Sequence, residues 1–179
     1  MAEIAGLKLI VPSSVAGSGV SVSASGKVTF TAATSVSVNG CFTSSYDNYL
    51  IVCRASMSTN VSAFYRLRAS GTDNSTANSY VGQVIYADNT TVGGARTTEN
   101  QGRVMGSFDT DTNGVHFYVY GPNLAQPTAA RSVAVSDYQS AYIVDYASTH
   151  NQSTAYDGFS FLVSGATWSG SLCVYGLSQ

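Results

Sequence analysis

The chain has 179 residues, a formal net charge of −2 and only 10% charged residues, against about 25% in an average soluble domain. Its eight Lys and Arg residues are scattered singly, which argues against a nucleic-acid partner and against a polybasic membrane-binding protein, because both need clustered cations. No apolar run approaches the roughly 18 residues of a membrane-spanning helix. Hydrophobic residues make up 44% of the chain, which is enough for the core of one domain.

The composition favours strands over helices. Val, Thr, Ser and Tyr are abundant, while Glu and Lys occur only twice each. β-Branched and aromatic side chains fit a pleated sheet, whereas a helix restricts their rotamers. No stretch keeps a 3.6-residue periodicity. The sequence therefore predicts an all-β protein, an antiparallel β-sandwich of jelly-roll-like topology with about nine or ten strands.

Residues 1–26 are interpreted as an extended N-terminal arm, which precedes a sandwich domain over residues 27–179. An apolar segment, Gly6–Pro12, is followed by Ser, Gly, Val and Ala alone up to Gly26. Lys8 interrupts this segment, which is not typical of a secretory signal. Burial of its apolar side chains hardly offsets the entropy of ordering it, so we expect order only where the arm pairs with a strand of a partner chain. The candidate interface residues in the arm are Leu7, Leu9, Ile10 and Val11.

From Lys27 onward, apolar and polar residues alternate as in strands with one buried face. Asn39-Gly40 is typical of a two-residue turn. In Ser62–Ala69 the alternation directs Tyr65 and Leu67 inward and Arg66 and Arg68 outward. The polar stretches Ser70–Ser79 and Asn89–Gly102, and the segment Gly121–Arg131, are predicted as loops. The other predicted strands lie around Val28–Phe30, Val36–Val38, Tyr49–Met57, Tyr80–Ala87, Arg103–Phe108, Val115–Tyr120, Arg131–Asp137, Ala141–Tyr146, Asp157–Val163 and Ser169–Tyr175.

One segment has the spacing of a metal-binding loop. Asp109-x-Asp111-x-Asn113-Gly114 matches the first half of a calcium-binding loop, with oxygen ligands at alternate positions and a Gly for the sharp turn. The twelfth position is Tyr120 instead of a bidentate Glu. A hairpin loop with an Asn-Gly turn explains the same residues, so we expect no metal and no cofactor.

The sequence offers no recognisable catalytic constellation. Of the two histidines, His116 alternates outward within a predicted strand and His150 follows one in a predicted loop. Neither has a second ligand at metal-binding spacing, and no nucleophile elbow or phosphate-binding loop is present. Paired carboxylates for glycoside cleavage stay open, since Asp residues distant in sequence can meet in space. We expect a protein without enzymatic activity.

Three cysteines, Cys41, Cys53 and Cys173, are expected to be reduced and to behave as small apolar residues. A Cys53–Cys173 bridge would need adjacent strands. Tyrosine is unusually frequent, with 12 residues against a single Trp. The strand Val115–Tyr120 directs His116, Tyr118 and Tyr120 away from its core face, which suits a protein–protein interface or a sugar-stacking platform. An interface is favoured, because so uncharged a surface is easier to understand when it is covered.

Three stretches of the sequence contain distinctive motifs. Phe42–Val52 contains the turn Tyr46-Asp47-Asn48-Tyr49, and Leu67–Asn74 contains Gly71 and Asp73. The third stretch comprises Asp157-Gly158-Phe159 and the closing Val174-Tyr175-Gly176. Together with the alternating strand before Asn39, these motifs resemble those of the small β-sandwich virion proteins of tailed bacteriophages. The resemblance covers residues 27–179, and its motifs carry structural residues only.

The resemblance implies a homo-oligomer, expected to be a trimer, on the surface of a virion assembled in the host cytoplasm. Family members serve as capsid decoration, head-fibre or tail-fibre proteins. A capsid decoration or cement protein is favoured here, because the 179 residues contain no coiled coil or collagen-like repeat and the arm suits clasping of neighbours. Its partners would be the major capsid protein or other virion proteins. The alternative is a tail- or head-fibre module that binds a host cell-surface glycan through its Tyr-flanked polar loops.

Overall fold

A computed structural model describes residues 6–137 and 141–178, and within them the chain forms two packed antiparallel sheets with no helix. The larger sheet has ten strands, β1 (Leu7–Ile10), β3 (Val20–Val22), β4 (Val28–Ala33), β6 (Asn48–Met57), β9 (Tyr80–Asp88), β10 (Thr91–Glu99), β12 (Asn113–Tyr120), β13 (Thr128–Ser136), β14 (Tyr142–His150) and β16 (Trp168–Leu177). The smaller sheet has six, β2 (Ser14–Ala16), β5 (Ser35–Asn39), β7 (Val61–Ala69), β8 (Thr72–Asp73), β11 (Gly102–Phe108) and β15 (Gly158–Val163). The expected antiparallel sandwich is confirmed.

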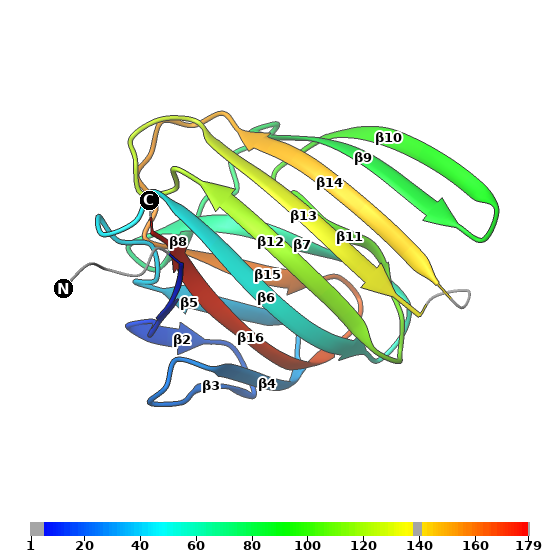
Figure 1. Cartoon of the computed structure of the whole chain (residues 1–179), viewed down its shortest axis with the longest axis horizontal. Coiled ribbons are helices and arrows are strands. Elements are labelled where there is room, and N and C mark those ends of the chain that lie inside the picture. Colours follow the sequence, from blue (N-terminus) through cyan, green and yellow to red (C-terminus); the bar gives the residue numbers. More distant parts are fainter. Residues whose placement is uncertain (1–5, 138–140, 179) are drawn as a thin grey trace.

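The chain crosses repeatedly between the two sheets. The larger sheet runs in the order β10-β9-β14-β13-β12-β6-β16-β4-β3, with β1 also paired to β16. The smaller sheet runs β11-β7-β15-β5-β2, with β8 beside β7. In Figure 1 the larger sheet lies in front, and the β9–β10 hairpin extends to its upper right beyond the other strands.

Aromatic rings from both sheets meet in the core. Phe117 of β12 packs against Tyr65 of β7 and Phe161 of β15, with ring centroids 4.6 Å and 5.5 Å apart. Trp168 at the start of β16 packs 4.6 Å from Phe30 of β4. The outer strands pack around this cluster, because burying such rings supplies a large share of the hydrophobic free energy.

Residues 6–26 contain three strands that pair with other strands of the same chain. Strand β1 pairs with the last strand β16, from Leu7↔Leu177 to Ile10↔Val174. The short strands β2 and β3 pair with β5 and β4. The expectation that the arm is ordered only against another chain is therefore wrong, because the C-terminal strand of the same molecule supplies the pairing edge. Residues 1–5 of the predicted arm lie outside the described residues.

Three local predictions also need correction. The expected loop Asn89–Gly102 is mostly strand β10, joined to β9 by a tight turn in which Asn89 has a φ of 53°. Asn39-Gly40 does not close a hairpin, since β5 and β6 belong to different sheets. Asp109–Gly114 likewise connects sheets, because β11 pairs with β7 while β12 pairs with β6 and β13.

Arg68 points away from the aromatic core, as predicted, but it is buried in a polar network of its own. Its guanidinium contacts Asp73, and it donates hydrogen bonds to Asn39 Oδ1 at 2.9 Å and Ser160 Oγ at 2.8 Å. The turn through Gly71 brings Asp73 back over the strand, and Ser160 in turn donates to Asp73 at 2.8 Å. The stretch Leu67–Asn74 therefore folds around its own Arg68, and Asn39 and Ser160 complete this group of contacts, the Arg68 clasp.

The other two family-like stretches contact one another. The ring of Tyr46 lies directly over Gly176, where an added Cβ would come within 2.5 Å of it. The Tyr49 hydroxyl lies 2.7 Å from the Thr43 carbonyl and holds the turn that precedes β6. Asp157 accepts a hydrogen bond from the Ser70 amide at 3.0 Å, while Gly158 passes close to the Val38 carbonyl. These motif residues thus have structural roles in joining strand ends.

Replacing Arg68 by Met should lower the free energy of unfolding by about 2–4 kcal/mol, because Asp73 would lose its buried counter-charge. Arg131→Met is the matched control, since the Arg131 side chain is 56% exposed and its ion pair lies in solvent. Its effect should be much smaller than that of Arg68→Met, because solvent screens an exposed ion pair. Urea denaturation measures both. Equal effects of the two substitutions would contradict the role given to the clasp.

Deleting residues 1–12 should leave a folded sandwich with a modest loss of stability, about 1–3 kcal/mol, because three of the four β1 residues are exposed and few hydrogen bonds are lost. Circular dichroism and urea denaturation check this outcome. A truncated chain that fails to fold would show that β1 is essential to the sheet.

Candidate interaction surface

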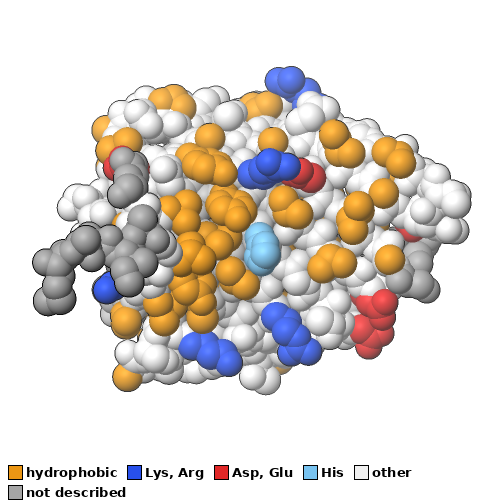
Figure 2. All heavy atoms as spheres, in the orientation of Figure 1, with side chains coloured by type: hydrophobic (Ala, Val, Ile, Leu, Met, Phe, Trp, Pro, Cys, Tyr) orange, Lys and Arg blue, Asp and Glu red, His pale blue; other side chains and the backbone are white. Residues whose placement is uncertain are grey.

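The outer face of the ten-stranded sheet is rich in apolar side chains. The register places Leu9, Tyr175, Leu50 and Tyr118 in one row across β1, β16, β6 and β12. A second row contains Cys173, Val52, His116 and Val133. Figure 2 looks onto this face and shows hydrophobic side chains gathered over the central strands and continuing toward the hairpin.

Exposed large apolar residues concentrate on this face. Ten such residues occur in the described part of the chain, and two of them, Val11 and Leu124, lie outside its strands. The other eight follow the outward positions of the ten-stranded sheet: Leu7, Leu9, Ile85, Val92, Tyr120, Val133, Val135 and Ile143. A face that gathers exposed apolar side chains in this way is a candidate interaction site.

Most of the predicted interface residues meet here. His116, Tyr118 and Tyr120 point outward from β12, while Val115, Phe117 and Val119 are buried. Leu7 and Leu9 reach the same face through the pairing of β1 with β16. Ile10 and Val11 do not belong to it. Ile10 packs against the hydrophobic core beside Val174, and Val11 follows β1 near Gly26.

The sequence interpretation predicted a strand at Arg131–Asp137 but did not find that the larger side chains of β13 point outward. Val133 and Val135 are exposed, whereas Ser132, Ala134 and Ser136 face the core. The small inward residues let β11 approach, and Ser132 donates a 2.6 Å hydrogen bond to the Val104 carbonyl of that strand. The run Ser132–Ser136 alternates small residues, Ser and Ala, with valines, and this pattern alone assigns the valines to the core.

Charges on the face are few and partly neutralised. Arg131 of β13 pairs with Asp145 of β14, with Nε 3.0 Å from Oδ1. Arg54 and Arg96 are the other outward-facing arginines. A shallow hollow of about 560 Å³ lies over Gly114, bordered by Val52, Val133 and Ile143. A second of about 370 Å³ lies over Gly82, Ala129 and Ala147, beside Tyr120.

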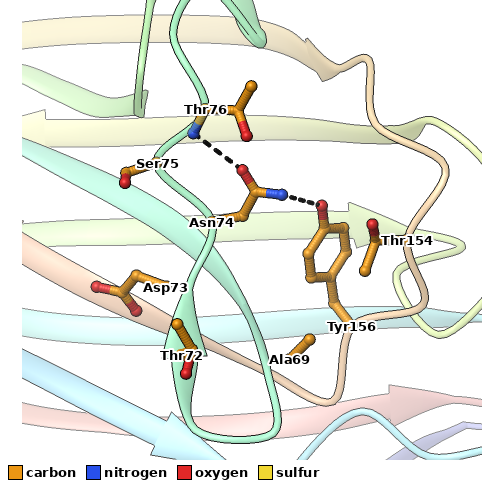
Figure 3. A pocket seen from close by; sticks show the side chains of 8 residues that line it. All are labelled: Ala69, Thr72, Asp73, Asn74, Ser75, Thr76, Thr154 and Tyr156. Carbon is orange, nitrogen blue, oxygen red and sulfur yellow. Dashed lines mark hydrogen bonds between the residues drawn. The ribbon is translucent and has the colours of Figure 1, made fainter.

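A polar hollow occupies another part of the molecule, between the turn after β8 and the segment before β15. Figure 3 shows its lining of small polar side chains around Asn74 and Tyr156. Asn74 Nδ2 donates to the Tyr156 hydroxyl at 2.9 Å, and the ring of Tyr156 is fully buried. A sugar ring cannot stack on a buried aromatic face, so this hollow is a poor glycan platform.

His150 is a structural residue in the fold. It ends β14, where a loop was expected, and is fully buried. Its ring lies 4.1 Å from that of Tyr80, and Nε2 is 2.6 Å from the Tyr156 hydroxyl. Because Asn74 donates to that hydroxyl, the hydroxyl can donate its own proton to a neutral imidazole. Burial lowers the pKa of His150 to about 4.

The Asp109–Gly114 segment is organised by its own hydrogen bonds. Asn113 is buried, accepts from the Asp109 amide at 2.9 Å and donates to the Ala55 carbonyl at 3.0 Å. Asp109 Oδ1 accepts from the Thr110 amide at 2.5 Å. Within residues 6–137 and 141–178, no group of three or more His, Cys, Asp or Glu is placed to hold a metal ion.

The cysteines are unpaired. Cys53 and Cys173 lie on adjacent strands, but Cys53 pairs with Leu172 and Cys173 with Val52. Their side chains therefore point to opposite faces of the sheet, which excludes a bridge. Burial raises the pKa of Cys53 to about 12 and that of Cys41 still further.

No helix in the described part of the chain is long and apolar enough to cross a membrane. Comparison of the chain with protein-family models and with curated proteins finds no match. The surface therefore has to be interpreted from its own chemistry.

Acidification should destabilise the fold through His150. The pKa of this residue is lower in the folded chain, so its contribution is complete above pH 6.5 and is lost as the pH falls from 6.5 toward 4. The loss approaches about 3 kcal/mol only below pH 4, where the folded chain is protonated as well. Urea denaturation at a series of pH values measures it. His150→Phe should flatten this part of the profile, and His116→Gln, on the exposed face, should leave it unchanged.

Proposed function

We propose that the chain is a non-enzymatic structural protein of a tailed-phage virion, which attaches to the particle through the outer face of its ten-stranded sheet. The observation that carries the proposal is the collection of eight exposed large apolar residues on that one face. The resemblance of three sequence stretches to small phage virion proteins is the reason for proposing a virion as the place where the chain acts. The site chemistry agrees, since the hydrogen bonds of His150 and Asn113 are structural.

The face can supply the free energy of attachment. Full burial of a large apolar side chain contributes about 1.5–3 kcal/mol, so covering eight half-exposed ones contributes on the order of 10 kcal/mol. Association costs about 4–15 kcal/mol, because the two partners lose translational and rotational freedom. The tyrosines and the neighbouring backbone therefore have to add hydrogen bonds. Tyr118 and Tyr120 are suited to this, because each joins apolar area to a polar tip.

A capsid decoration or cement role fits the shape of the face. The apolar positions spread over β1, β16, β6, β12, β13, β14 and β9, which suits a broad protein surface better than a small ligand. The partners would be the major capsid protein, other virion proteins and further copies of this chain. A shell protein covered in this way gains stability against internal pressure through the added interfaces.

A fibre module that binds a host glycan is the second candidate, and one observation favours it. The rings of Tyr118 and Tyr120 are nearly parallel, with centroids 6.3 Å apart and an angle of 10°. The hollow beside them is lined by Gln83, Arg96 and Arg131, which can donate to sugar hydroxyls. Ala substitution of both tyrosines would then abolish glycan binding on an array while leaving particle assembly intact.

The attachment proposal is tested by placing a charge on the face. Val133→Lys should reduce occupancy on the virion at least tenfold, because the ammonium group would be buried without a partner. Leu124→Lys is the matched control, since Leu124 is 42% exposed and Val133 43%. Occupancy is measured as the amount of this chain per major capsid protein in purified particles.

Imaging of labelled particles shows which role applies. Label over the head supports the capsid role, and label at the tail tip together with glycan binding supports the fibre module. Equal occupancy of the Val133→Lys and Leu124→Lys proteins would overturn attachment through this face. Turnover of a polysaccharide by the purified chain would overturn the non-enzymatic proposal.

A further inference from the structure

Strand β10 leaves one edge of the larger sheet open over its whole length. Among the described strands it pairs with β9 alone, in an unbroken register from Thr91↔Asp88 to Glu99↔Tyr80. Six of its nine residues are exposed and the other three only half-buried. In an antiparallel strand, alternate residues direct both backbone groups to the same neighbour. Close to half of the backbone donors and acceptors of β10 therefore face solvent.

The other sheet edges are protected in ways that β10 is not. The opposite edge of the larger sheet is β3 and one edge of the smaller sheet is β2, and each has only three residues. Strands β1 and β8 also pair with a single neighbour each, but they have only four and two residues, and β1 contains Lys8. Strand β11 breaks its register at two points along β7. Short strands, irregularities, Lys and Pro are the usual devices that stop edge-to-edge pairing. Strand β10 has no register break, Lys or Pro.

We propose that β10 pairs antiparallel with the β10 of a second copy of this chain. Full overlap of the nine residues about a twofold axis places Ala95 of one copy opposite Ala95 of the other. Val92 then faces Thr98, Gly94 faces Arg96, and Thr91 faces Glu99. The only two charged residues of the strand meet no like charge in this register. Glu99 is in addition neutralised by Arg103, 2.7 Å away.

The side chains of the strand suit such a contact. Gly93, Gly94 and Ala95 stand at its centre, so the second backbone meets no bulky group there. Gly93 also accommodates the ring of Tyr86, where a Cβ would come within 2.5 Å. Figure 1 shows the hairpin projecting clear of the other strands, so a second molecule can approach its edge without obstruction by them.

The register is tested by cysteine cross-linking of the whole chain. Ala95→Cys, made together with Cys173→Ser because Cys173 is half-exposed, places two thiols opposite each other across the axis. Directly opposed Cβ atoms lie about 4.5–5.5 Å apart, within reach of a disulfide after small adjustment. Thr97→Cys is the control on the same face of the same strand. Its two thiols would lie four residues apart, about 13 Å.

Diamide, which takes up the two protons and two electrons released by a thiol pair, should cross-link the Ala95→Cys protein at least ten times faster than the Thr97→Cys protein. Sedimentation equilibrium of the unmodified chain should give twice the monomer mass of 18.7 kDa. A monomeric mass at high concentration, equal cross-linking rates, or a trimeric mass without preferential cross-linking of the Ala95→Cys protein would each overturn the proposal. None of these results bears on attachment through the sheet face, which the Val133→Lys variant tests separately.

Discussion

The packing of two sheets of unequal width governs the rest of this molecule. The aromatic cluster around Phe117 holds the six-stranded sheet against the centre of the larger one. A smaller sheet cannot cover ten strands, so the β9–β10 hairpin extends past it, as Figure 1 shows. The limit of the area covered by the smaller sheet lies within β9. Tyr80 and Val84 are buried, whereas Tyr86 is only half-buried. Both the open edge and the wide outer face follow from this mismatch.

Strand β13 directs its small residues toward the core and its valines toward solvent, and this arrangement affects both the core and the surface. Because β11 packs closely beneath it, β13 can place only small side chains inward, and Ser132 compensates by bonding to the Val104 carbonyl. Its valines then have to face outward. The same strand thus keeps the sandwich thin and supplies Val133 and Val135 to the apolar face. A strand of the opposite phase would pack a larger core and leave a polar surface, so the exposed valines are unfavourable in an isolated monomer.

Local alternation was sufficient to predict the sandwich and part of the surface. The strand Val115–Tyr120 was assigned correctly, with His116, Tyr118 and Tyr120 outward, because its inward residues are large and apolar. Alternation failed where a strand contains glycine and polar residues, as in Thr91–Glu99, since exposure on both faces removes the period-two signal. It assigned Arg68 to the outward side, but it could not show that the turn through Gly71 covers that side. The pairing of Leu7–Ile10 with the last strand joins distant parts of the chain, and no local pattern reports such a contact.

Pairing of two molecules through the open edge of β10 would bring their apolar outer faces side by side. In a twofold edge pair the axis is perpendicular to the sheet, so the outer faces of both copies lie on the same side. The outward residues of β10, such as Val92 and Arg96, belong to the same face as Ile85 and Gln83 of β9. Pairing would therefore extend one apolar face across two molecules instead of hiding it. Once the face of one copy is bound to the particle, the face of the second copy is held close to its own binding site, which raises its effective concentration there. Two weak attachments on a repetitive particle surface then hold more firmly than one, and this gain requires no new contact within either face.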